Sequence, residues 1–243
     1  MNFSAIATAI NKVKYAGAVP MCGVLGDTEL FNYFAGYQVA AQQLAGVPLT
    51  KFPATDFEAL TPVIQSALWN SFPTQTNAQG DRLKNAVMNL SGRDRPFFKE
   101  GWADANRLRR DGLRWIPVTS ANISIPVVSI HTLGDLFVPF KMEQVYFDRA
   151  KAKGTDKFLV QRAIRDVGHC AFTAAEATTA FDDMVKWEAG GPKPAGDDVK
   201  TAATVASPAY GCGFTKNTPS AKDYTSPAGR ARFQSAYLAC PAN

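Results

Sequence analysis

The chain has 243 residues, of which 46% are hydrophobic and 11% aromatic, so it is long and apolar enough to bury a sizeable core. This composition excludes a disordered protein, and no apolar stretch approaches the roughly 20 residues that a membrane helix requires. The formal net charge is +5, but the Lys and Arg residues are scattered along the sequence and are not accompanied by an aromatic platform or a known binding motif. We therefore expect no nucleic-acid partner, and we also expect no membrane partner.

The first 27 residues are predicted to contribute one helix and one strand to a sheet. Small and apolar residues recur at helical spacing over residues 2–13. Gly17–Cys22 is a short apolar run that has the length of a strand, and a glycine-containing loop follows it up to Asp27. We therefore assign residues 1–27 to the core of the fold.

Residues 28–122 show no alternation of strands and helices. Their apolar spacing predicts four helices, over residues 28–44, 57–72, 81–90 and 96–113. Thr55 and Glu58 form a capping box at the start of the second helix, whereas Pro62 predicts a boundary or a kink within it. Four helices between two strands predict an inserted all-α subdomain, which would act as a cap.

Strands and helices alternate again over residues 123–190. The predicted elements are a strand over Ile125–His131, a helix over Lys141–Lys153, a strand over Phe158–Ala163 and a helix from a capping box at Thr173 to about Glu188. A strand, a helix and a strand make a βαβ unit, so the turns that follow the two strands should lie at the same sheet edge. The fold class that we predict is therefore α/β.

Asp135 and His169 are the candidate catalytic residues. Asp135 follows the first of these strands in a Gly-Asp turn, and His169 follows the second in a Gly-His-Cys sequence. Each alone has a structural explanation, because aspartate commonly stabilises turns. Together they lie 34 residues apart, the length of one βαβ unit, in the acid-then-histidine order of a Ser…Asp…His triad. We predict that the carboxylate fixes the tautomer of the imidazole.

Other residues were considered for the same roles. His131, the only other histidine, is interpreted as a structural group beside the acid, and Asp27 and Asp166 are alternative acids. No G-x-S-x-G motif occurs, although a nucleophile elbow needs small residues on both sides of its serine. Cys22 follows a predicted strand, which leaves a Cys-His-Asp arrangement as an alternative.

The four cysteines predict disulfide bonds rather than a metal site. Cys212 and Cys240 bracket a Gly-, Ser-, Thr- and Pro-rich stretch of the irregular residues 191–243, which predicts a stapled C-terminal tail. Cys22 and Cys170 each follow a predicted strand, and two buried free thiols are the alternative for them. Without a C-x-x-C pair we expect no metal and no cofactor. Two disulfides indicate a secreted or periplasmic protein whose targeting signal is not in this sequence.

Three stretches together resemble α/β-hydrolases, in particular exported bacterial serine hydrolases with a helical cap. They are residues 18–27, residues 131–139 and residues 165–170. The Gly-Asp and His-Cys pairing is also similar to the tannase and feruloyl esterase group, whose histidine precedes a disulfide-bonded cysteine. The resemblance covers about residues 1–190. It implies that the chain supplies strands six to eight of the hydrolase sheet, with the cap inserted between strands six and seven.

The resemblance implies a serine hydrolase that cleaves a carboxylic ester or related acyl bond of a small molecule. Asp135 and His169 match the family's acid and base, and a Cys22–Cys170 disulfide would anchor the histidine loop beside the site. The second implied disulfide joins Cys212 and Cys240. The nucleophile serine and both oxyanion-hole amides would lie upstream of this sequence, so we expect a fragment that is inactive alone.

The alternative to an enzyme is a catalytically inactive truncated hydrolase or an acyl-ligand-binding protein. Six aromatic residues of the cap could wall a substrate pocket or simply pack the cap: Phe31, Phe34, Trp69, Phe72, Phe97 and Trp102. The sequence assigns neither the substrate and its binding residues nor the oligomeric state.

Overall fold

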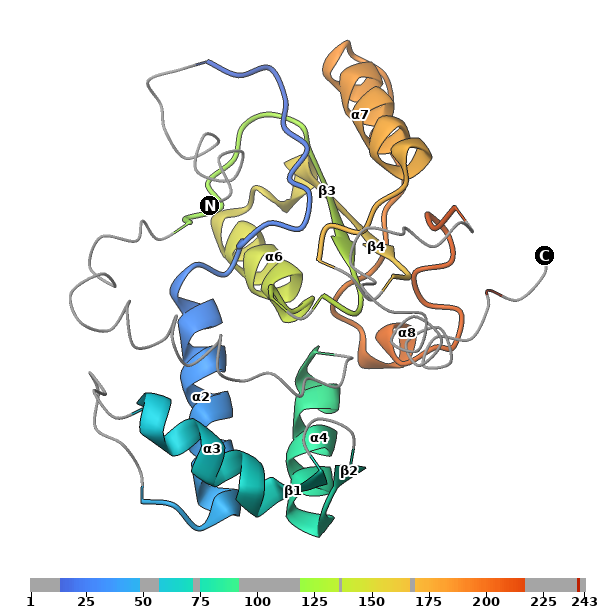
Figure 1. Ribbon diagram of the computed structural model, residues 1–243. Coiled ribbons are helices and arrows are strands. Elements are labelled where there is room, and N and C mark those ends of the chain that lie inside the picture. Colours follow the sequence, from blue (N-terminus) through green and yellow to red (C-terminus); the bar gives the residue numbers. More distant parts are fainter. Residues whose placement is uncertain are drawn as a thin grey trace. The chain divides into compact units, whose positions relative to one another are not determined.

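The computed structural model describes residues 14–48, 57–71, 75–91, 119–135, 137–166, 169–216 and 240 (Figure 1). It divides into two compact units, residues 1–26 with 119–243 and residues 27–118. The sequence placed the inserted segment at 28–122, but Ala121 packs with the apolar residues beside the sheet. The helices expected over residues 2–13 and 96–113, and Thr55 of the expected capping box, lie outside the described residues.

The first unit is built on two parallel strands, β3 (Val127–Thr132) and β4 (Leu159–Ile164), which pair in register along their whole length. Helix α6 (Lys141–Lys153) and the short 3-10 helix η2 (Asp156–Phe158) connect them. All six residues of each strand are buried. Burial of both faces is typical of a parallel sheet covered by helices, so the predicted βαβ unit is present.

The predicted first strand lies along the opposite edge of β3 as two separate parallel bridges, Ala18 with Val127 and Met21 with Ile130. The carbonyl of Pro20 accepts a hydrogen bond from the Ile130 N–H at 3.0 Å. The next bond of a continuous ladder would need an N–H at Pro20, which proline lacks. The segment is therefore interrupted at its centre rather than forming one strand.

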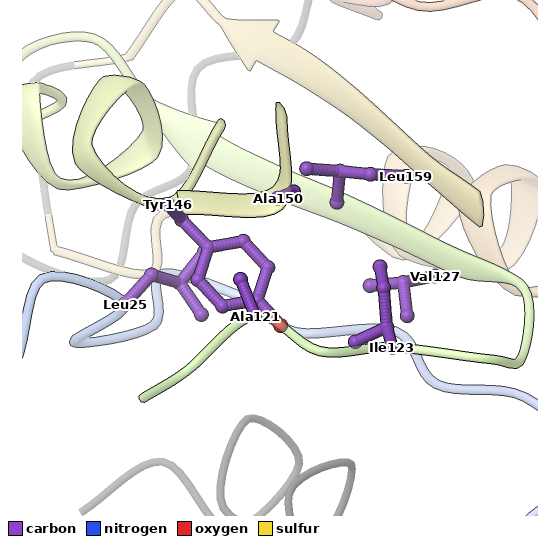
Figure 2. Packing of buried hydrophobic residues seen from close by; sticks show 7 residues of the cluster. All are labelled: Leu25, Ala121, Ile123, Val127, Tyr146, Ala150 and Leu159. Carbon is purple, nitrogen blue, oxygen red and sulfur yellow. The ribbon is translucent and has the colours of Figure 1, made fainter. Parts of the chain in front are cut away.

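Helices cover the two faces of this sheet. On one face, α6 contributes to a cluster of buried apolar side chains: Leu25, Ala121, Ile123, Val127, Tyr146, Ala150 and Leu159 (Figure 2). On the other face, Ala180 and Met184 of α7 (Ala174–Glu188) pack against alternate strand residues such as Ile130. The predicted capping box is present, since Thr173 and Glu176 exchange side-chain and backbone hydrogen bonds.

The chain after α7 runs along the free edge of β4. Asp197 donates its backbone N–H to the Gln161 carbonyl at 2.7 Å, and its carboxylate accepts the Ala163 N–H at 2.8 Å. The short helix α8 (Ala202–Val205) follows. This part of the tail therefore occupies backbone groups that an exposed strand edge would otherwise leave unpaired.

The second unit contains the helices α2 (Thr28–Ala45), α3 (Phe57–Leu68) and α4 (Ala78–Ser91). Helix α3 continues through Pro62. The expectation of an all-α cap is wrong, because β1 (Trp69–Ser71) and β2 (Gln75–Thr76) pair as antiparallel strands.

The hairpin lies between α3 and α4. The predicted helix over 57–72 ends early, at Leu68, and β1 begins at the next residue. Asn77 then links the two neighbouring helices. Its side-chain N–H donates to the Ala67 carbonyl at 2.7 Å, and its side-chain oxygen accepts the N–H groups of Gln79 and Gly80 at the start of α4.

Among the described residues, no helix is both long and apolar enough to cross a membrane.

Candidate active site

The turns after β3 and β4 lie side by side at the carboxyl edge of the sheet. The Leu133 N–H donates to the Ile164 carbonyl at 2.9 Å, and the Gly134 N–H donates to the Asp166 carbonyl at 2.9 Å. These two bonds extend the contact between the strands beyond their last paired residues. They position the backbone that carries Asp135 beside the segment that leads to His169.

Asp135 and His169 are in direct contact. Asp135 Oδ2 lies 2.6 Å from His169 Nδ1, and the acid is fully buried whereas 35% of the imidazole side chain is exposed. The other carboxylate oxygen, Oδ1, accepts the backbone N–H groups of Phe137 and Val138, both at 2.9 Å. The carboxylate therefore stabilises its own turn with one oxygen and orients the imidazole with the other.

The imidazole is arranged so that one nitrogen is held and the other is open. Nδ1 of His169 contacts the carboxylate, while Nε2 makes no hydrogen bond to any residue that the structure describes. The ring of Phe137 lies beside it, with the two ring centroids 5.6 Å apart. An imidazole held in this way can accept a proton at Nε2, and the negative carboxylate stabilises the resulting positive charge.

Asp135 remains ionised in spite of its burial. Burial by itself would raise the pKa of this carboxyl group, but the hydrogen bonds and positive charge of His131 and His169 lower it below its usual value. Of the three acids weighed from the sequence, Asp135 is the one that lies 2.6 Å from His169.

His131 contacts the same acid from the other side. Its Nε2 lies 2.7 Å from the Val138 carbonyl oxygen and 3.4 Å from Asp135 Oδ2, and its Nδ1 lies 3.2 Å from Glu143 Oε1. The ring is fully buried. Burial alone would lower the pKa of His131, but Asp135 and Glu143 outweigh it and raise the pKa to about 10.

Glu143 was not among the residues singled out from the sequence. It is 1% exposed and accepts the Ser129 hydroxyl at 2.7 Å and the Gln161 side-chain N–H at 2.5 Å. A signal for it exists in the helix pattern. Glu143 shares helical spacing with Tyr146 and Ala150 on the buried side of α6, where an acid requires a polar partner.

Two disulfide bonds are present, and they pair Cys22 with Cys170 and Cys212 with Cys240. The Cα atoms of the first pair are 5.2 Å apart, and both residues have left-handed backbone, with φ of 49° and 54°. Such backbone is uncommon outside glycine. The bond therefore closes a constrained turn that begins directly after His169. Disulfides are typical of proteins outside the reducing cytosol.

The Cys22–Cys170 bond removes the Cys-His-Asp alternative for the oxidised protein. A cysteine nucleophile acts as a thiolate, and the sulfur of Cys22 is already bonded to another sulfur. Among the described residues, Cys22, His169 and Cys170 bring potential metal-ligand atoms within 4.8 Å of one another. The same bond occupies both of these sulfurs.

The aromatic residues considered for a substrate pocket divide into two groups. Trp69 is 7% exposed and belongs to the apolar core of the second unit. The side chains of the other five lie outside the described residues. The structure thus brings Asp135, His169 and Cys170 together with Cys22, and it gives Trp69 a packing role.

Comparison with known proteins gives one partial similarity to report. No family model matches the chain, and no solved structure matches it. A stretch of 62 residues is 32% identical to an o-phthalyl amidase from Xanthobacter agilis. The match spans 26% of this chain and 14% of that protein. This similarity points to a hydrolase and to no narrower class.

Proposed function

We propose that the chain carries the acid and the general base of a serine-dependent acyl hydrolase with the α/β-hydrolase fold. The observation that carries the proposal is the 2.6 Å contact between the buried Asp135 carboxylate and the partly exposed His169 imidazole. Their position after two neighbouring parallel strands fits the acid and histidine of such a site. The partial similarity to an amidase supports an acyl bond as the target.

The proposed mechanism assigns one proton path to His169. A serine hydroxyl attacks the acyl carbon, and His169 Nε2 takes the hydroxyl proton as the new C–O bond forms. The imidazolium then gives that proton to the leaving oxygen or nitrogen when the acyl bond breaks. A water molecule repeats the two steps and releases the acid. Asp135 stabilises each imidazolium stage without taking the proton itself.

We infer that the nucleophile lies outside this sequence, since no serine in it stands in a G-x-S-x-G motif. The substrate class is a small carboxylic ester or a related acyl bond such as an amide. We place the protein in the periplasm or outside the cell, which is consistent with its two disulfides.

The test uses the complete natural protein that contains this sequence. Its hydrolysis of p-nitrophenyl esters and p-nitroanilides is compared with that of Asp135→Asn and His169→Ala variants. Loss of the correct tautomer in Asp135→Asn should reduce kcat by about 10⁴-fold, and loss of the base in His169→Ala by about 10⁶-fold. Asp148→Asn is the matched control, because that acid pairs with Lys200 at the surface. Full activity of the His169→Ala variant would refute the proposal.

The 243-residue chain itself should not turn over these substrates. A fluorophosphonate probe, which labels activated serines, should likewise leave it unlabelled, because the chain lacks a nucleophile elbow. Turnover by this chain that persists in Cys22→Ala and disappears in His169→Ala would reveal a nucleophile within it and contradict the proposed division of the site.

A further inference from the structure

The proposed mechanism gives no role to the buried imidazole of His131, although this ring contacts Asp135. We propose that His131 is an imidazolium, protonated at neutral pH, which acts as the shared internal counter-cation of Asp135 and Glu143 and positions the Asp135 carboxylate for His169. Its charge state follows from the contacts of the ring alone. Its catalytic meaning rests on the proposed function.

Both ring nitrogens of His131 face oxygen atoms that accept hydrogen bonds. Nε2 lies 2.7 Å from the carbonyl oxygen of Val138, which can only accept, so Nε2 must carry a proton. Nδ1 lies 3.2 Å from Glu143 Oε1. A neutral imidazole carries one N–H, so it could satisfy only one of these two contacts with a carboxylate and a carbonyl.

The contacts of Glu143 place Nδ1 of His131 as a donor, since the oxygen that it faces already accepts another hydrogen bond. Its Oε1 already accepts the Ser129 hydroxyl at 2.7 Å, and its Oε2 accepts the Gln161 side-chain N–H at 2.5 Å. A proton on Nδ1 adds a third donor to the two that the carboxylate of Glu143 already has.

Charge balance supports the same assignment. Asp135 and Glu143 are 0% and 1% exposed, and two buried carboxylates without a cation would carry a large desolvation penalty. His131 lies between them and reduces the local charge from −2 to −1. When His169 is also protonated, the four groups together are neutral. The fixed cation therefore keeps Asp135 ionised while allowing the second imidazole to gain and lose its proton.

Other groups around the ring do not replace this cation. Phe140 meets it edge-on, with ring centroids 5.9 Å apart. The ring of Tyr210, in the tail, contacts Phe140 edge-on, and the negative charge of Glu143 acts on the Tyr210 phenol. Burial, and then the nearby carboxylates, hold the pKa of the Tyr210 phenol well above its usual value, so that it stays neutral. Ser129 from β3 and Gln161 from β4 contribute uncharged donors to Glu143.

The charge of His131 can be measured directly, because the chain contains two histidines only. Labelling with ¹⁵N-histidine gives two ring systems in an NMR spectrum, and a His169→Asn variant assigns them. We expect both ring nitrogens of His131 to remain protonated from pH 6 to about 9, in agreement with a pKa of about 10. A neutral tautomer of His131 at pH 7 would overturn the inference, whether or not the protein hydrolyses anything.

A pair of variants tests whether Glu143 holds the proton in place. In Glu143→Gln the amide removes one of the two negative charges beside the ring, so we expect His131 to lose a ring proton within the same pH range. Glu176→Gln is the control, since Glu176 is also a buried acid at 5% exposed but contacts Thr173 and Lys216 instead. Unchanged protonation of His131 in both variants would refute the role of Glu143.

The pH–rate profile of the complete protein tests whether His131 positions Asp135, because a purely structural role of His131 would leave that profile unchanged. With His131 neutral, the carboxylate of Asp135 would stabilise the protonated form of His169 without competition from a second cation. The acid limb of the pH–rate profile in Glu143→Gln should therefore shift to higher pH, and that in Glu176→Gln should not. The positioning role would be disproved if the acid limb of Glu143→Gln is unshifted although NMR shows that His131 is neutral in that variant. Absence of hydrolysis by the complete wild-type protein would refute only the proposed function.

Discussion

At the scale of single residues, Asp135 fills two roles that the sequence presented as alternatives. A Gly-Asp turn is explained by backbone capping alone, and Oδ1 does accept the N–H groups of Phe137 and Val138. Oδ2 is left for His169, at 2.6 Å. Because a carboxylate has two oxygens, the turn fixes the direction of the oxygen that faces the imidazole. The capping contacts thus contribute to the geometry of the candidate site.

The buried charges predict how stability depends on pH. The pKa of His131 is raised from 6.5 to about 10, so its contribution to folding is complete below about pH 6.5 and is lost as the pH rises toward 10. The lowered pKa of Asp135 acts at the other end, since its contribution is lost as the pH falls below about 4.

Urea denaturation followed by circular dichroism should therefore show the free energy of unfolding falling between pH 7 and pH 10. The slope is at most about 1.4 kcal/mol per pH unit for one group. Both disulfides are formed and no described cysteine is free, so a thiol does not contribute. The decline should persist in His169→Asn and become smaller in Glu143→Gln. Constant stability from pH 7 to pH 10 would contradict it.

At the scale of elements, the sequence predicts what local patterns determine. The bounds of α6 and the capping box of α7 follow from apolar spacing and from the Thr173–Glu176 pair. The hairpin β1–β2 is missed, because its strands are only three and two residues long and mostly polar, so they carry no alternation that would identify a strand. The interruption at Pro20 concerns a single missing N–H within an otherwise strand-like segment.

The docking of the tail on β4 could not be predicted, because an irregular segment has no periodicity to reveal its partner. Gly196 shows how close the approach is. A Cβ atom at this position would lie 2.9 Å from the Gln161 carbonyl oxygen and 2.9 Å from a methyl group of Val160. The sequence indicated a tail held by Cys212 and Cys240, whereas the structure adds backbone pairing through Asp197.

The contact of Asp197 with β4 makes this docking testable. Asp197→Ala removes the carboxylate that accepts the Ala163 N–H, which leaves a buried strand N–H unpaired. We expect a loss of about 1–3 kcal/mol in the free energy of unfolding, measured by urea denaturation. Asp182→Ala on the exposed side of α7 is the control and should change stability by less than about 0.5 kcal/mol. Equal effects of the two substitutions would show that the tail contact contributes nothing.

At the scale of the whole molecule, the division into two units follows from the sequence, whereas not all the partners of the candidate site do. Residues 27–118 form a unit inserted between the segment that ends at Cys22 and the strand β3. A long stretch without predicted strands was enough to indicate such an insertion. The contact between Asp135 and His169 was predictable because parallel strands bring their carboxyl ends together. Glu143 and the charge on His131 were not, since they depend on which side chains of α6 meet the sheet.

Because of the insertion, we expect the two disulfides to contribute different amounts to the free energy of unfolding. Cys22 and Cys170 are separated by 148 residues and enclose the whole second unit, whereas Cys212 and Cys240 are separated by 28. If each bond acts by restricting the unfolded chain, the longer loop contributes about 5 kcal/mol and the shorter about 4 kcal/mol.

Urea denaturation of two double variants separates these contributions: Cys22→Ala/Cys170→Ala and Cys212→Ala/Cys240→Ala. We expect the first to be the more destabilising, and in the complete protein to lower hydrolysis as well, because His169 directly precedes Cys170. A larger loss from the tail pair would contradict this order and show that the length of the closed loop does not decide the contribution of each bond.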